Sequence, residues 1–151
     1  MKKPRILLAD DHPVILNALC GLLEEDGVVE VVGMVTDGQA LVEAAQRLKP
    51  DIIIADISMP KLNGLDATRA LQTTVPQSKV IILSVHREAV YTSLAFQAGA
   101  RGYLLKRTNL LTELSQALLH VLAGDRYIGL GVTEGCEPAE EAEVLTKGAK
   151  S

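Results

Sequence analysis

The chain has 151 residues, of which 48% are hydrophobic, and a formal net charge of -4. These values favour one domain with a full hydrophobic core and a short appendage, and they leave little room for a second domain. The apolar runs are only strand-length, and the N-terminus meets an acidic pair too early for a signal peptide, so we expect a cytoplasmic protein without a membrane span. Cys20 and Cys136 belong to no CxxC motif or Cys/His cluster, which predicts reduced thiols and argues against a zinc site.

Strands and helices are predicted to alternate along the chain. Continuous apolar runs predict five strands, at residues 5–9, 28–35, 51–56, 79–85 and 102–106. Apolar residues at helical spacing predict five helices, at residues 14–25, 39–48, 65–73, 87–98 and 110–123. Pro13 suits the first turn of the first helix, Asp37 would cap the second, Pro50 would end it, and Gly99 and Gly124 would end the fourth and fifth.

This alternation predicts an α/β fold in which a doubly wound parallel sheet has helices on both faces. The flavodoxin-like version of the fold has five strands in the order 2-1-3-4-5, and ligands bind beyond the carboxyl ends of its strands. We place this domain at residues 1–124. Residues 125–151 are interpreted as a linker or tail, with a polar, Gly-rich composition that favours disorder.

The third predicted strand lies in DIIIADISMPKLNG, at residues 51–64. Its isoleucines predict burial on both faces, and Asp56 stands where the chain surfaces. The Met59-Pro60 pair forces an extended turn, and Gly64 allows a sharp entry into the next helix. A single acid is therefore expected at the mouth of a rigid strand, under a structured loop.

Polar side chains lie at the carboxyl ends of four of the predicted strands. Asp10 and Asp11 follow the first strand, and the third, fourth and fifth strands end at Asp56, Ser84 and Lys106. Taken singly, each of these residues is more often a helix cap, a turn acid or a strand-end lysine. Three carboxylates at one edge repel one another, however, and need either raised pKa values or a cation. A hard ion such as Mg²⁺, with oxygen ligands, suits this arrangement.

The motifs ADDHP, ADISMPKLNG, ILSVH and GYLLK, in this order, resemble the receiver domain of bacterial two-component response regulators, especially the branch with a LuxR-type helix-turn-helix output. The resemblance covers residues 3–123. It implies that Asp56 is the phosphoacceptor, and that Asp10 and Asp11 hold Mg²⁺ together with Asp56 and the backbone carbonyl of Ser58. It also implies a hydroxyl switch, a phosphate-pairing cation and a switch aromatic, which are Ser84, Lys106 and Tyr103.

The implied chemistry is physically reasonable. A carboxylate can attack a phosphoryl group to form an acyl phosphate, while Mg²⁺ and a lysine neutralise charge on the transferring group. The protein would then be a phosphoacceptor with autocatalytic phosphotransfer and dephosphorylation only, not an enzyme. A hydrogen bond from Ser84 to the new phosphoryl oxygen would draw its loop inward, and Tyr103 would follow.

Partners are also implied by the resemblance. A sensor histidine kinase would supply the phosphoryl group, and the output would be transcription regulation. The switch would alter the face formed by the fourth helix, fifth strand and fifth helix, so we expect a homodimer through this face or through the fifth helix, which has more apolar residues than one core-facing stripe needs. Alternatively, this excess packs against residues 127–132.

Direct DNA binding is not expected of these residues. The stretch after residue 124 is acidic, is too short for a recognition helix and lacks a basic stripe. Contact with DNA would therefore be made only through an output domain absent from this chain. The stretch EPAEEAEVLTKGAKS resembles the opening of the first helix of such a domain, so residues 125–151 are interpreted either as a linker or tail or as a remnant of the start of an output domain.

Three other functions would place different demands on the same residues. A flavodoxin-type cofactor binder would need an amide-donating loop where Asp10 and Asp11 stand. A haloacid dehalogenase-type phosphatase would need a second acid at the position of Ser58. A degenerate receiver that acts as a phosphorylation-independent interaction module stays open, because Val85 is larger than the alanine often found after the switch serine. His12 is interpreted as a surface residue and is left without a role.

Overall fold

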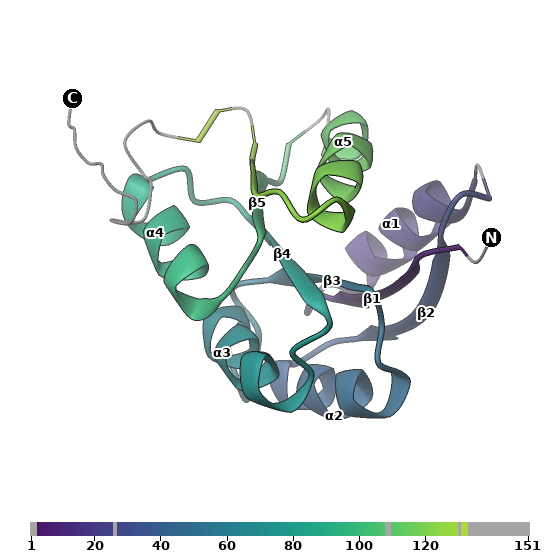
Figure 1. Ribbon diagram of the computed structural model, residues 1–151, viewed down its shortest axis with the longest axis horizontal. Coiled ribbons are helices and arrows are strands. Elements are labelled where there is room, and N and C mark those ends of the chain that lie inside the picture. Colours follow the sequence, from purple (N-terminus) through teal and green to yellow (C-terminus); the bar gives the residue numbers. More distant parts are fainter. Residues whose placement is uncertain (1–2, 26, 108–109, 130, 133–151) are drawn as a thin grey trace.

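A parallel sheet lies between two layers of helices in the computed structural model, which describes residues 3–25, 27–107, 110–129 and 131–132 (Figure 1). The strands are β1 Arg5–Ala9, β2 Glu30–Val35, β3 Ile52–Asp56, β4 Lys79–Ser84, β5 Gly102–Leu105 and β6 Tyr127–Ile128. The helices are α1 Pro13–Glu25, α2 Gly38–Leu48, α3 Gly64–Thr74, α4 Ala89–Ala98 and α5 Leu110–Leu122. Within the described part of the chain, no helix has the length and apolar character needed to cross a membrane.

The strand order is β2-β1-β3-β4-β5-β6, and each described pair of neighbouring strands is parallel. The predicted flavodoxin-like fold and its order of the first five strands are therefore confirmed. The sixth strand was not predicted, because two residues are too few to show a periodic pattern. Tyr127 pairs with Gly102 and Ile128 with Tyr103, so the sheet continues beyond residue 124. Residues 133–151 of the predicted tail lie outside the described residues.

Alternation along the strands explains why they are apolar throughout. In β3, Ile52 and Ile54 pack in the hydrophobic layer under α1 and α5. Ile53 and Ala55 face the opposite layer, which α2, α3 and α4 cover. Successive side chains of a strand point to opposite faces, so a strand covered on both sides needs apolar residues at every position.

Helix ends follow the expected capping chemistry, with small shifts. The Asp37 carboxylate accepts a hydrogen bond from the Ala40 amide at 2.7 Å and caps α2. That helix ends at Leu48, its C-cap Lys49 has a φ of 48°, and the predicted stop at Pro50 follows directly. Helix α4 begins at Ala89, two residues later than predicted, and its N-cap Glu88 makes no side-chain capping bond.

The loop after β3 is pressed against the end of the strand. The Gly64 amide donates to the Ile57 carbonyl at 2.8 Å. A Cβ atom at Gly64 would overlap the Asp56 carbonyl oxygen. Gly64 is therefore required by the close approach of two backbone segments, which holds the end of β3 in place.

Candidate functional site

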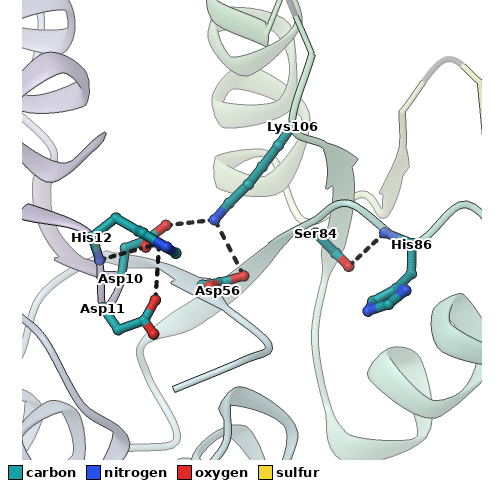
Figure 2. A network of polar contacts seen from close by, with 7 residues as sticks. All are labelled: Asp10, Asp11, His12, Asp56, Ser84, His86 and Lys106. Carbon is teal, nitrogen blue, oxygen red and sulfur yellow. Dashed lines mark hydrogen bonds and ion pairs between the residues drawn. The ribbon is translucent and has the colours of Figure 1, made fainter. Parts of the chain in front are cut away.

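Acidic and basic side chains meet at the carboxyl ends of β1, β3 and β5 (Figure 2). Asp56 is the last residue of β3, whereas Asp10 and Lys106 directly follow β1 and β5. One ligand atom from each of Asp10, Asp11, His12 and Asp56 can be chosen so that all four lie within 4.8 Å of one another. The structure thus brings together the three acids and the lysine that sequence analysis placed at this edge.

Lys106 bridges the two buried acids. Its Nζ lies 2.7 Å from Asp10 Oδ2 and 3.4 Å from Asp56 Oδ1. The lysine side chain is 15% exposed, and those of Asp10 and Asp56 are 2% and 9% exposed. Such a nearly buried cation offsets charge that would otherwise be costly to remove from water.

The pKa values of the two buried acids move in opposite directions. Burial raises the pKa of the Asp10 carboxyl, but hydrogen bonds from Lys106 and His12 outweigh this effect and bring the pKa below its ordinary value. Burial also raises the pKa of Asp56, where the charge of Lys106 offsets only part of the effect and the charges of Asp10 and Asp11 add to it. As the pH falls, Asp10 therefore stays ionised to a lower pH than Asp56.

His12 joins the two adjacent acids. Its Nδ1 lies 2.9 Å from Asp10 Oδ1 and 2.9 Å from Asp11 Oδ1, and its backbone amide donates to Asp10 Oδ1 at 2.9 Å. The hydrogen bond to Asp10 and the charge of Asp11 raise the pKa of the His12 imidazole. Sequence analysis gave His12 no role, although its position next to the acid pair was the available signal.

The donor set fits a hard divalent cation. Asp10, Asp11 and Asp56 offer carboxylate oxygens, and the Asp11 side chain is 35% exposed, so a bound ion would keep access to water. Mg²⁺ prefers oxygen ligands and retains several waters, which agrees with this arrangement. Ser58 is an exposed residue two positions beyond Asp56, and the role of its carbonyl as a ligand stays a prediction.

The two expected switch residues are linked through the backbone of His86. Ser84 Oγ accepts a hydrogen bond from the His86 amide at 3.0 Å, and Figure 2 shows it directed toward His86 and away from Asp56. The Tyr103 hydroxyl donates to the His86 carbonyl at 2.5 Å, and the Tyr103 side chain is completely buried. Sequence analysis did not predict that the His86 backbone amide and carbonyl link the two switch residues, because backbone groups are the same in every residue type. Val85, which lies between Ser84 and His86 in the chain, is 71% exposed.

Comparison with known proteins agrees with the fold and with this geometry. Residues 6–118 match the response regulator receiver domain family. The response regulator GacA of Pseudomonas viridiflava is 37% identical over 124 residues, which are 82% of this chain and 58% of GacA. The transcriptional regulatory protein DegU of Brevibacillus brevis is 37% identical over 131 residues, which are 87% of this chain and 55% of DegU. The chain thus spans little more than half the length of these relatives.

Solved structures lead to the same family. A LuxR-family response regulator from Aurantimonas sp. SI85-9A1 superposes with a TM-score of 0.81 and 30% identity, covering 87% of this chain and 93% of that one. The receiver domain of the putative regulator NarL from Mycobacterium tuberculosis gives a TM-score of 0.78 and 32% identity, covering 82% and 99%. Because the family match spans most of the sequence and these two superposing structures are those of response regulators, the chain belongs to the response regulator receiver domain family.

Proposed function

We propose that Asp56 of this two-component receiver accepts a phosphoryl group, and that the resulting change in charge alters a protein-interaction surface. The observation that carries the proposal is the position of Lys106 Nζ between Asp10 and Asp56, at an edge where a third acid, Asp11, also lies. A carboxylate beside a fixed cation can attack phosphorus while the cation offsets charge on the phosphoryl oxygens.

The roles divide according to contacts. Asp56 supplies the attacking oxygen; its bond to phosphorus forms while the bond from phosphorus to the donor breaks, and the electron pair of that bond leaves with the donor. Lys106, already 3.4 Å from Asp56 Oδ1, pairs with an oxygen of the transferred group. Asp10 and Asp11, together with Asp56 and the Ser58 carbonyl, would hold Mg²⁺. When bound, Mg²⁺ supplies further neutralisation of the charge on the phosphoryl group. Both cations favour the ionised Asp56 that attack requires, against the effect of burial on its pKa.

Receiver domains of this family are phosphoacceptors, not classical enzymes, and their partners are sensor histidine kinases. For this chain we infer autocatalytic phosphotransfer and dephosphorylation only, with a histidine kinase as the donor. The cytoplasmic location expected from the sequence belongs to the same proposal.

The switch would begin at Ser84. A phosphoryl oxygen on Asp56 is charged and accepts hydrogen bonds more strongly than most neutral groups. The Ser84 hydroxyl is therefore expected to rotate toward it and donate a hydrogen bond. This turn removes the acceptor of the His86 amide, and the His86 carbonyl is in turn held by Tyr103. Movement of this loop would therefore reach β5 and the start of α4.

The output surface is proposed to include α5. Pairing of β6 covers one edge of β5, so part of the expected α4–β5–α5 face is occupied by the chain itself. Leu119 and Leu122 of α5 are 71% and 37% exposed, and they line an apolar groove with Leu22 and Val28. This distribution favours a homodimer through α5 on the side that faces α1. Neighbouring structures include one described as two RcsB dimers bound to two parallel DNAs, at 27% identity.

Transcription regulation is proposed as the final output, because one relative is a transcriptional regulatory protein and the matched residues span only 58% and 55% of the two relatives. In this proposal any contact with DNA is made by an output domain outside the 151 residues.

Incubation with Mg²⁺ and acetyl phosphate, followed by intact-mass measurement, tests the proposal. We expect the added mass of one phosphoryl group, which hydroxylamine should remove because it cleaves acyl phosphates. The gain should require Mg²⁺ and should be absent in Asp56→Asn. Asp66→Asn, which changes an exposed acid of α3, is the matched control and should gain the mass. No gain in the unchanged protein, or a gain that persists in Asp56→Asn, would contradict the assignment.

A further inference from the structure

We propose that His12 adds an imidazole nitrogen ligand to the divalent-cation site, so that this site selects first-row transition-metal ions such as Ni²⁺ more strongly than three carboxylates alone would. The inference deepens the proposed function and rests on its cation site. His12, which lies outside the expected ligand set, would then help to determine which ion the site binds most tightly.

The spacing of the ligand atoms carries the argument. His12 Nδ1 lies 2.9 Å from Asp10 Oδ1 and 2.9 Å from Asp11 Oδ1. Two ligands at right angles around one ion, each at about 2.0–2.2 Å from it, are about 2.8–3.1 Å apart. The imidazole nitrogen thus has the separation from both carboxylates that neighbouring positions of an octahedral ion require, and Asp56 lies within the same cluster.

The remaining contacts leave these atoms available. Lys106 binds the other oxygen of Asp10, Oδ2, so Oδ1 is the oxygen that faces His12. The backbone amide of His12 fixes Asp10 Oδ1 at 2.9 Å. The His12 side chain is 62% exposed, which lets the ring adjust and leaves other positions of an ion open to water. Without a cation, an Nδ1 proton can bridge the acids, and ligation requires the neutral ring with its proton on Nε2.

An imidazole ligand changes which divalent ions the site binds most tightly. Imidazole suits nickel, copper and zinc, whereas magnesium prefers carboxylate, carbonyl and water. A given site also binds divalent ions more tightly toward the end of the first row. Loss of the imidazole should therefore weaken Ni²⁺ binding much more than Mg²⁺ binding.

The test compares Ni²⁺ and Mg²⁺ binding by titration calorimetry in the intact chain and in His12→Asn. The asparagine amide can still donate to the acids but offers no imidazole. We expect Ni²⁺ affinity to fall at least about tenfold, since loss of an outer-shell partner of a metal ligand already costs about 10–100-fold, with a much smaller change for Mg²⁺. The chain has three histidines, and His120→Asn, which changes an exposed residue of α5, is the matched control.

A second measurement detects the bond itself. Nickel bound to an imidazole shifts the ring N–H proton far outside the normal range of the proton NMR spectrum. We expect such a resonance in the unchanged protein and in His120→Asn, and its loss in His12→Asn. If both ions bind but the resonance is absent, or if His12→Asn keeps the ratio of the two affinities, the role of His12 is overturned and the carboxylate site stands. If neither ion binds, the proposed cation site fails as well.

Discussion

Replacement of Lys106 by methionine probes the electrostatic centre of the site. The ammonium group lies 2.7 Å from Asp10 Oδ2 and 3.4 Å from Asp56 Oδ1, and the lysine side chain is 15% exposed. Methionine keeps most of the aliphatic volume, so the main loss is the charge. The variant then has two nearly buried carboxylates without their shared cation.

The expected loss of stability follows from these distances. At an effective dielectric constant of about 20, each ion pair attracts by about 5–6 kcal/mol before desolvation is subtracted. Removing one partner of a buried pair costs about 3–5 kcal/mol overall. Asp10 keeps the hydrogen bond from the His12 amide at 2.9 Å, which continues to stabilise its charge. We therefore expect the free energy of unfolding to fall by the lower figure, about 3 kcal/mol near neutral pH without divalent ions.

Acid and Mg²⁺ should both reduce this deficit. The cost comes from ionised Asp10 and Asp56, so it should shrink as the pH falls and these carboxyls are protonated. Mg²⁺ should bind the variant more tightly than the unchanged protein, since a competing cation has been removed. Mass action then stabilises the folded variant by more than it stabilises the unchanged protein. Phosphorylation should nevertheless be slower, because the transferring group loses a positive partner.

Urea unfolding followed by circular dichroism measures the effect, with Lys61→Met as the control. Lys61 is 65% exposed and lies 3.8 Å from Asp37 Oδ2, and an exposed pair of this kind contributes about 0–1 kcal/mol. If Lys106→Met costs no more than Lys61→Met, or if its deficit is unchanged on acidification, the electrostatic account of the site is wrong.

Three further predictions use the same folding and binding assays. Burial raises the pKa of Asp56, so its ionised form lowers the free energy of unfolding at pH values above that pKa. Asp56→Asn should therefore stabilise the metal-free protein near neutral pH, and this gain in the free energy of unfolding should vanish below the ordinary aspartate pKa. A gain that is independent of pH would refute this. Asp11→Asn should weaken Mg²⁺ binding at least about tenfold in titration calorimetry, and an unchanged affinity would exclude Asp11 as a ligand. Gly64→Ala should cost about 1–3 kcal/mol through overlap with the end of β3, whereas Gly21→Ala, with nothing within 4 Å, should be mildly stabilising; equal effects would contradict the packing argument.

Much of the architecture could be predicted from local patterns. The apolar run that ends in Asp56 predicts a buried parallel strand with an acid at its mouth, and β3 is that strand. Asp37 caps α2 as predicted, because a side chain that accepts from an amide three residues ahead needs only local geometry. The convergence of acids and lysine also follows from a general property of parallel sheets, whose carboxyl ends share one edge.

The contacts that give the site its properties were decided by tertiary structure. Lys106 and Asp10 are 96 residues apart in the chain, and their 2.7 Å contact depends on the relative positions of β1 and β5 across the sheet. The link from Ser84 to Tyr103 passes through backbone atoms of His86, which no residue pattern encodes. Local sequence sets periodicity and capping, whereas distances between side chains of different elements arise when the sheet and its helices pack together.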